Sequence, residues 1–376
     1  MFMDVSSEMI HALLPVFLVS SLGASATAVG IIEGLGEGTA SISKLFSGWL
    51  SDRMATRKLL AVIGYGLGTL SKPVFALAPS AFWVGAARFS DRLGKGIRGA
   101  PRDALVADLT PPEARGAAYG LRQSLDTVGA FAGPLLAILL MARSGNDFRL
   151  VFRLALLPGL IAVLVLIFGV SEPERRLSAT KGPPIRWSEL RRFGVPFRSV
   201  VAVGAILTLA RFSEAFLILR AQNVGLPLAL TPLVLVLMNA VYAATAYPVG
   251  AISDRVGRTA LLAPGFVTLA LADIVLAGAS GIGGVMAGIA LWGLHMGITQ
   301  GVLAAMVADS APEDLRGSAF GLFNLVTGVA TLFASFIAGV LWQAFGPGAT
   351  FLSGAVITSA GLLAGISTRA VRIGRN

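Results

Sequence analysis

Ionisable residues are unusually dense between residues 88 and 103, inside an otherwise apolar stretch. At 100° per residue, five of them fall on one helix face about 100° wide. The five are Arg88, Asp91, Arg92, Lys95 and Arg102, and Arg98 lies just outside the face. Such a row of cations can bind an anionic group or set the pKa of nearby carboxylates.

Carboxylates recur at helical spacing in other apolar stretches, as members of pairs four residues apart, which share a helix face. Two such pairs are Glu33 with Glu37 and Arg122 with Asp126, and Asp4 and Glu8 lie in the first apolar stretch. A carboxylate beside an arginine stays ionised and can take a proton when that partner is lost. We interpret the whole set as a polar cavity for substrate and protons. The alternative is a self-neutralising network of salt bridges that only holds helices together.

The composition places these charges in a membrane. Of the 376 residues, 55% are hydrophobic and 13% charged, and the mean hydropathy is +0.79. The apolar runs are about 20 residues long, which suits a helix crossing roughly 30 Å of hydrocarbon. Ionisable groups at membrane depth cost at least about 2.5–3.5 kcal/mol each, so they should face the bundle interior. The absence of cysteine excludes disulfides and thiolate metal sites.

The hydropathy pattern predicts an all-α integral membrane protein with twelve transmembrane helices. We expect them at residues 1–22, 28–50, 59–77, 81–109, 117–141, 150–170, 199–221, 229–252, 261–279, 284–309, 318–345 and 350–367. The first run reaches full length only if it begins at residue 1, since 22 residues rise about 33 Å. We therefore expect its cytoplasmic end to lie upstream of Met1.

Two segments occur twice at nearly one offset. The segment at residues 48–58 returns at 250–258, and the segment at 106–120 returns at 307–321. Two matched pairs indicate a duplicated unit of about half the chain. We predict two pseudo-symmetric six-helix halves, residues 1–170 and 198–376, joined by a cytoplasmic connector at 171–197 that includes a short interfacial helix near 187–193.

Basic residues predict the orientation. Seventeen flank the spans on the side of the duplicated loops, against four on the other side: Arg143, Arg149, Arg153 and Arg220. The positive-inside rule therefore places both termini, the duplicated loops and the connector in the cytoplasm. The net charge of +10 reflects this topology, so we expect the lipid bilayer as partner and no nucleic acid.

The duplicated loop Gly-x-Leu-x-Asp-Arg-x-x-x-Arg-Lys resembles the signature loop of the major facilitator superfamily. The resemblance covers the whole chain and implies two halves related by an axis along the membrane normal. It also implies that the loops latch the cytoplasmic side, each Asp facing a helix N-terminus of the other half and the arginines bridging to acids. The residues carried over as this gate are Gly48, Asp52, Arg53, Arg57, Gly250, Asp254, Arg255 and Arg258.

Two narrower resemblances favour export. Gly129-x-x-x-Gly133-Pro134 resembles a motif of exporters that run as antiporters; the alternative is ordinary small-residue packing with a proline kink. The segments at residues 4–9, 91–98 and 100–105 resemble a bacterial, exporter-like branch of the superfamily, similar to antiporters of drugs or metabolites and protons. This branch implies a location in the bacterial inner (cytoplasmic) membrane.

The sequence thus predicts a secondary transporter that exports a small organic molecule by proton-coupled antiport and alternating access. The excess of cations at 88–102 leans weakly toward an anionic substrate. A divalent metal exporter and a proton-coupled uptake symporter are the alternatives. No nucleotide-binding loop or catalytic motif indicates an enzyme, and we expect no cofactor, no metal site and a monomer.

The second half carries few polar residues inside its spans. We expect Arg211 and Glu214, three residues apart, to form a satisfied pair. Asn239, Tyr242 and Asn324 are candidates for the other wall of a substrate cavity. His295 is expected to be a packed histidine rather than a ligand.

Overall fold

The computed structural model describes residues 1–53, 56–111, 115–171, 192–256, 258–311 and 316–373, and the regular elements in these ranges are helical. The helices of the first half are α1 (Phe2–His11), α2 (Leu14–Val16), the π-helix η1 (Phe17–Ser21), α3 (Ala26–Arg53), α4 (Arg57–Leu77), α5 (Ala81–Leu109), α6 (Arg115–Arg143), α7 (Phe148–Leu154) and α8 (Leu156–Gly169). Those of the second half are α10 (Val195–Ala210), α11 (Ala215–Asn223), the 3-10 helix η3 (Leu228–Leu230), α12 (Leu233–Val256), the 3-10 helix η4 (Arg258–Ala260), α13 (Leu262–Gly278), α14 (Ile282–Ser310), α15 (Arg316–Phe345) and α16 (Pro347–Ile373).

These elements confirm the predicted twelve membrane helices. Ten segments of the described chain are long and apolar enough to cross a bilayer. The remaining two, α3 and α5, have 28 and 29 residues and are also long enough. They fall short in hydropathy because they carry the charged residues at 33–44 and 88–103. The two long helices that fall short in hydropathy therefore hold much of the predicted charged set.

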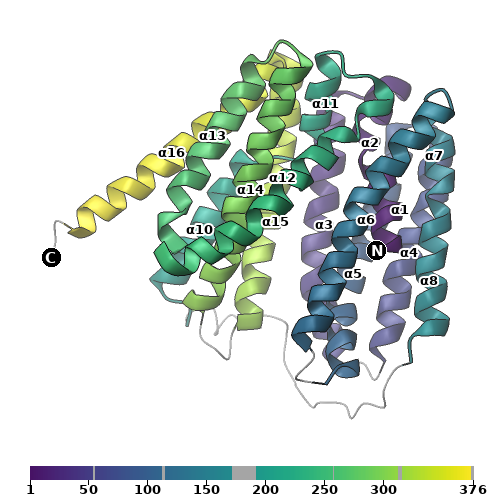
Figure 1. The fold of residues 1–376 in the computed structure, drawn as a ribbon, viewed down its shortest axis with the longest axis horizontal. Coiled ribbons are helices and arrows are strands. Elements are labelled where there is room, and N and C mark those ends of the chain that lie inside the picture. Colours follow the sequence, from purple (N-terminus) through teal and green to yellow (C-terminus); the bar gives the residue numbers. More distant parts are fainter. Residues whose placement is uncertain (54–55, 112–114, 172–191, 257, 312–315, 374–376) are drawn as a thin grey trace.

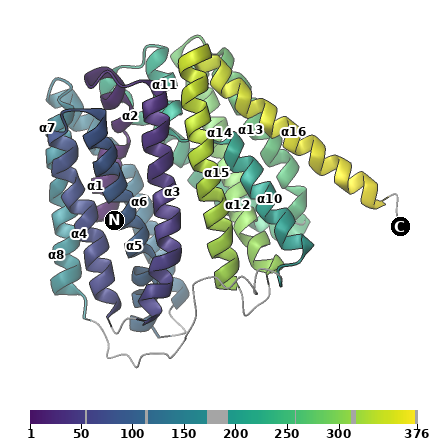
Figure 2. The same ribbon diagram turned by 180° about the vertical axis from the view of Figure 1, so that it is seen from behind.

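The helices form two groups, α1–α8 and α10–α16, with α3 and α15 side by side at the boundary between them (Figures 1 and 2). One end of the molecule, where α3, α5, α8, α12 and α14 terminate, is called the loop end. The other end, which holds α2, α7 and α11, is called the opposite end (Figure 1). Most of the predicted connector, with its interfacial helix, lies outside the described residues, and α10 begins at Val195.

Three predicted spans are interrupted rather than continuous. The first breaks between α1 and α2 just before Pro15, which has no N–H to donate. The sixth breaks at Ala155, whose carbonyl accepts a hydrogen bond from Ser6 Oγ at 2.6 Å. The seventh breaks between α10 and α11 at residues 211–214, where the Ser213 N–H donates to Ser335 Oγ at 3.2 Å. At the sixth and seventh breaks a side-chain hydroxyl bonds a backbone group, as a break at membrane depth requires.

Glycines hold α5 against α4. The position of a Cβ on Gly94 lies 2.5 Å from the Gly64 carbonyl oxygen, and one on Gly64 lies 2.7 Å from the Gly94 carbonyl oxygen. Only residues without a side chain allow two backbones to approach this closely. The contact of Gly94 with Gly64 thus fixes the height and rotation of α5, the helix that carries Arg92 and Lys95.

We expect Gly94→Val to destabilise the protein by about 1–3 kcal/mol, because the new side chain would meet the backbone of α4. The measurement is the free energy of unfolding in mixed micelles. Gly66→Ala on α4 is the matched control, since nothing lies within 4 Å of its Cβ position. That control should be neutral or slightly stabilising, and equal losses in both variants would contradict the packing argument.

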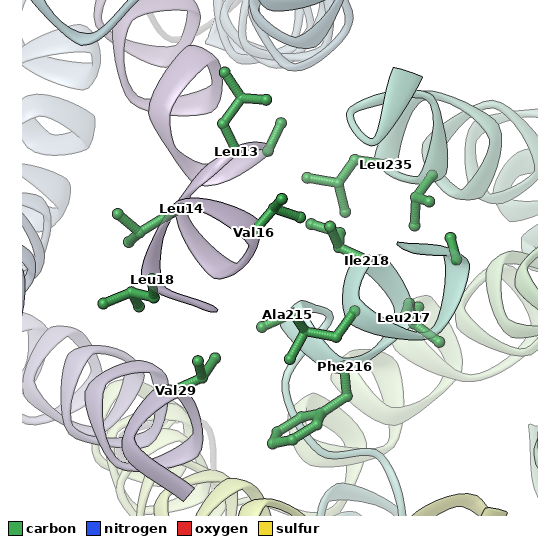
Figure 3. Packing of buried hydrophobic residues seen from close by; sticks show 14 of the residues in the cluster. Leu13, Leu14, Val16, Leu18, Val29, Ala215, Phe216, Leu217, Ile218 and Leu235 are labelled. Atoms are coloured by element: carbon green, nitrogen blue, oxygen red, sulfur yellow. The ribbon is translucent and has the colours of Figure 1, made fainter. Parts of the chain in front are cut away.

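A hydrophobic plug closes the opposite end between the two groups. It brings residues of α1–η1 and α3 against α11 and α12 (Figure 3). The labelled members are Leu13, Leu14, Val16, Leu18, Val29, Ala215, Phe216, Leu217, Ile218 and Leu235. Each of them is at most 1% exposed, so the plug excludes water. It begins directly after His11 in the first group and after Glu214 in the second.

Candidate transport cavity

A cavity of about 310 Å³ lies between the two groups, on the loop side of the plug. Its size is at the lower end of the range for small-molecule sites. Helices α1, α3, α5 and α6 contribute to one wall, and the break between α10 and α11, together with α12 and α15, contributes to the other. The ionisable side chains that line it are Glu8, His11, Glu33, Glu37, Arg92, Lys95, Arg211 and Glu214.

The wall from the first group is built on ion pairs between α3 and α5. Arg88 Nη2 lies 2.6 Å from Glu33 Oε2 and 3.7 Å from Glu37 Oε1. Arg92 Nη1 lies 3.2 Å from Glu37 Oε1. Arg88 and Glu33 are at most 2% exposed, whereas the Glu37 side chain is 37% exposed toward the cavity. The pairing predicted from spacing therefore exists, and Glu37 is its accessible member.

Helix α1 adds a histidine to this wall. His11 Nδ1 lies 3.2 Å from Glu8 Oε2, and His11 Nε2 lies 3.9 Å from Glu33 Oε2. The ring therefore links the carboxylate of α1 to that of α3. His11 was not among the predicted site residues, although its place three residues after Glu8, on one helix face, was a usable signal.

Asp91 points away from the cavity, toward α4. Its Oδ1 atom accepts from Lys72 Nζ at 2.7 Å, and Lys72 also donates to Ser7 Oγ at 3.1 Å. Lys72 is 1% exposed, and the sequence reading missed it. A lone lysine inside a predicted span was the available signal, because such a residue needs a buried partner.

Replacing Lys72 by methionine should destabilise the protein by about 3 kcal/mol, because Asp91 loses its closest cation. The loss is at the low end of the range for buried pairs, since Arg92 Nε still lies 4.0 Å from Asp91. Unfolding in mixed micelles measures it. The double variant Lys72→Met with Asp91→Leu should recover most of the loss. A double variant no more stable than Lys72→Met would refute the pairing energetics.

Asp4, Arg122 and Asp126 were predicted to line the cavity, but they lie in a separate cluster between α5 and α6, with Asp4 on α1. Arg122 Nη1 lies 3.2 Å from both Asp103 Oδ1 and Asp126 Oδ2. Arg102 Nη2 lies 3.5 Å from Asp126 Oδ2. None of these residues is part of the described cavity lining.

Arg98 also lies outside the cavity. Its guanidinium stacks over the Tyr65 ring, 5.0 Å from the centroid, and it is 4% exposed. The Cβ positions of Gly64 and Gly68 meet its side chain, so α4 is shaped around it. Helical spacing placed Arg98 just outside the charged face of residues 88–102. This angle around α5 turns the Arg98 side chain toward α4.

The wall from the second group differs from the expected Arg211–Glu214 pair. Within the described contacts, no ion pair joins the two side chains. With the Gln300 amide oriented so that its oxygen faces the guanidinium, that oxygen accepts from Arg211 Nη1 at 2.7 Å and Nη2 at 3.1 Å. The expectation was wrong because it assumed a continuous helix, and α10 ends at Ala210. Off the helical register, residues three apart no longer face each other.

Asn239 lines the same cavity, as predicted, and Asn324 lines a neighbouring cavity of about 230 Å³ with Arg211 and Gln300. Tyr242 is in neither described lining. His295 is 1% exposed, with Nδ1 2.9 Å from the Gly265 carbonyl oxygen, and it is also one of the residues that line the neighbouring cavity.

The predicted gate is only partly within the described residues. Five of its eight residues are not among the side chains that the structure describes: Gly48, Asp52, Arg53, Asp254 and Arg255. Arg57 is buried, and the Cβ position of Gly250 meets nothing within 4 Å. Arg258 pairs with Asp309 and donates to the Ala305 carbonyl at 2.8 Å, which ties the second loop to α14.

Gly129 and Gly133 place α6 directly on α1. Cβ positions on these glycines lie 2.8 Å from Asp4 Cβ and 2.7 Å from Glu8 Cβ. The motif ends at Pro134, which lies inside α6. The described contacts are thus small-residue packing that holds the carboxylate face of α1 in place.

Comparison with known proteins agrees with this architecture. The family model of the Major Facilitator Superfamily matches residues 1–220 and 201–372. An MFS-type transporter of Methanocaldococcus jannaschii is 33% identical over 94% of this chain and 89% of its own. The multidrug resistance protein MdtH of Cronobacter sakazakii is 30% identical over 46% of this chain and 42% of its own.

Solved transporters share the fold at low sequence identity. The nucleoside transporter NupG has a TM-score of 0.79 at 13% identity, covering 97% of this chain and 96% of its own. A bacterial homologue of the human lysosomal transporter Spinster has a TM-score of 0.73 at 16% identity, covering 96% and 91%. The chain therefore belongs to the major facilitator superfamily and is a multi-pass secondary transporter rather than an enzyme.

Proposed function

We propose that this transporter exports a small organic molecule by proton-coupled antiport, with alternating access of the cavity to the two membrane faces. The observation that carries the proposal is the ion-paired wall of the cavity, in which Glu37 is both accessible and held by Arg92 at 3.2 Å. A carboxylate in this setting can exchange a proton when helix movement separates it from its arginine.

The proposed orientation puts the loop end and both termini in the cytoplasm of a bacterial inner membrane. The excess of basic residues beside the loop-end helix termini supports it. The two rocking units would be residues 1–170 and 198–376, with 171–197 as connector. Because the plug closes the opposite end, the state described is the one expected when the cavity communicates with the cytoplasm.

Two resemblances support export over uptake. MdtH of Cronobacter sakazakii carries the name of a multidrug resistance protein, and its similarity covers 46% of this chain. The Gly129-x-x-x-Gly133-Pro134 segment resembles the antiporter-type motif, and here it places Glu8 at the cavity. The proposed latch includes Arg258 with Asp309, which joins the second duplicated loop to α14.

The test uses everted membrane vesicles with an imposed pH gradient and a fluorescent report of its collapse. Organic anions, organic cations, zwitterions and divalent metal ions are added as separate panels. An organic panel should collapse the gradient, and Glu37→Gln should abolish the response. Asp147→Asn is the matched control, since this N-cap of α7 lies far from the cavity lining and asparagine caps equally well.

Three results would contradict the proposal. A response to metal ions alone would indicate a metal exporter, and proton movement in the direction of substrate would indicate a symporter. A full response in Glu37→Gln would remove Glu37 from the coupling.

A further inference from the structure

The carboxylates on the first wall of the cavity already have cationic or histidine partners on that wall. Glu33 is held by Arg88, Glu37 by Arg92, and Glu8 by His11. These contacts join α1, α3 and α5 within one group of helices. The acids of this wall are therefore largely satisfied before any substrate enters.

Lys95 is the cation left over on this wall. It lies three residues after Arg92 on the same face of α5, lines the cavity and is exposed. Among the contacts that the structure describes, its ammonium group has no hydrogen bond or ion pair. A compact ammonium group with three donors is suited to an anionic ligand group.

Glu214 is the corresponding anion on the second wall. It lies at the break between α10 and α11 and lines the same cavity. The nearby cation, Arg211, is engaged by the Gln300 amide. Within the described residues the Glu214 carboxylate has no hydrogen bond or ion pair from its side chain. Beside Arg211, whose guanidinium has a neutral amide as its partner, the cavity thus presents one ammonium group and one carboxylate without a hydrogen-bond or ion-pair partner among the described contacts, from opposite halves.

We propose that the substrate is a small zwitterion, whose anionic group binds Lys95 and whose ammonium-type group binds Glu214. This inference rests on the proposed transport function and names the class of substrate for the same cavity. A simple anion would leave Glu214 in a shrinking, dehydrated cavity, and a simple cation would do the same to Lys95. An unpaired charge in a dehydrated cavity costs more free energy than a second ion contact contributes. Ligands with only an anionic group or only a cationic group are therefore disfavoured.

The geometry also gives the zwitterion a role in closure. Because Lys95 belongs to α5 and Glu214 to the α10–α11 break, a ligand that binds both charges joins the two helix groups. A ligand with one charge would be held by one group only. Bridging both walls is the differential contact that a ligand needs to favour a closed state.

The experiment compares probes that share one skeleton and differ by one charged group. One triad is phenylalanine, 2-phenylethylamine and 3-phenylpropionate, and a second is leucine, isoamylamine and 4-methylpentanoate. Binding to the purified full chain in detergent is measured by thermal shift over a concentration series, without any proton gradient. We expect the zwitterion of at least one triad to bind about tenfold more tightly than its acid and its amine.

Two variants assign the contacts. In Glu214→Gln the amine should lose its binding, and the acid should approach the affinity of the zwitterion. In Lys95→Met the acid should lose its binding, and the amine should approach the zwitterion. Lys44→Met on α3, exposed and outside the cavity lining, should keep the wild-type order. Equal melting temperatures without probe show that the variants fold.

The inference is overturned if acids or amines bind as tightly as the zwitterions in both triads, or if both variants weaken all three probes equally. Its failure is distinct from that of antiport. Preferential zwitterion binding without proton movement in vesicles would refute antiport alone. Proton movement driven only by anions would keep antiport and refute the zwitterion.

Discussion

Arg88→Met is expected to destabilise the protein by about 5 kcal/mol, the largest loss we expect from a single substitution. Arg88 is 2% exposed and lies within 3.7 Å of two carboxylates, Glu33 and Glu37. Removing it leaves Glu33, which is 1% exposed, as a buried charge whose closest cation is gone. The free energy of unfolding in mixed micelles measures the loss.

The matched control for Arg88 is Arg102→Met in the separate cluster on α5 and α6. Arg102 is 24% exposed and Asp103 38%, so this change should cost only about 0–1 kcal/mol. Adding Glu33→Gln to Arg88→Met should recover part of the loss, because the stranded charge disappears. If Arg88→Met unfolds at the wild-type denaturant concentration, the Glu33–Arg88 pair does not hold α3 to α5.

Gly34→Val is expected to abolish transport and to destabilise the protein by about 1–3 kcal/mol. Gly30, Gly34 and Gly38 lie four residues apart on α3 and face α15 across the boundary between the helix groups. A Cβ on Gly34 would lie 2.9 Å from the Leu332 carbonyl oxygen and 3.1 Å from Leu332 Cα. Backbone atoms cannot rotate away, so the two groups would be wedged apart.

Gly38→Ala, one turn along the same face, provides the control for Gly34. Its Cβ would lie 3.5 Å from the flexible end of Leu332, an ordinary van der Waals contact. This variant should therefore transport normally in the vesicle assay. Normal transport by Gly34→Val would show that the close approach of α3 and α15 is not needed for alternating access.

The sequence alone determined the number of helices and their charged faces. In lipid each backbone group must be bonded within its own segment, so apolar runs of about 20 residues can only be helices. Helical spacing then placed Arg88, Arg92 and Lys95 on one face of residues 81–109.

Spacing along one helix does not reveal which helix it faces, and the tertiary structure decided the partners. Lys72 pairs with Asp91 because Gly64 and Gly94 bring α4 close to α5. Packing of α6 on α1 and α5 put Asp126 beside Arg102, away from the cavity.

The break between α10 and α11 had the largest consequence for the site. A continuous helix would pair Arg211 with Glu214, whereas the unwound backbone turns them apart and leaves Glu214 at the cavity. No proline or glycine at residues 211–214 announces this break. It is stabilised by Ser335, which is 122 residues away in the chain, so only the folded protein could reveal it.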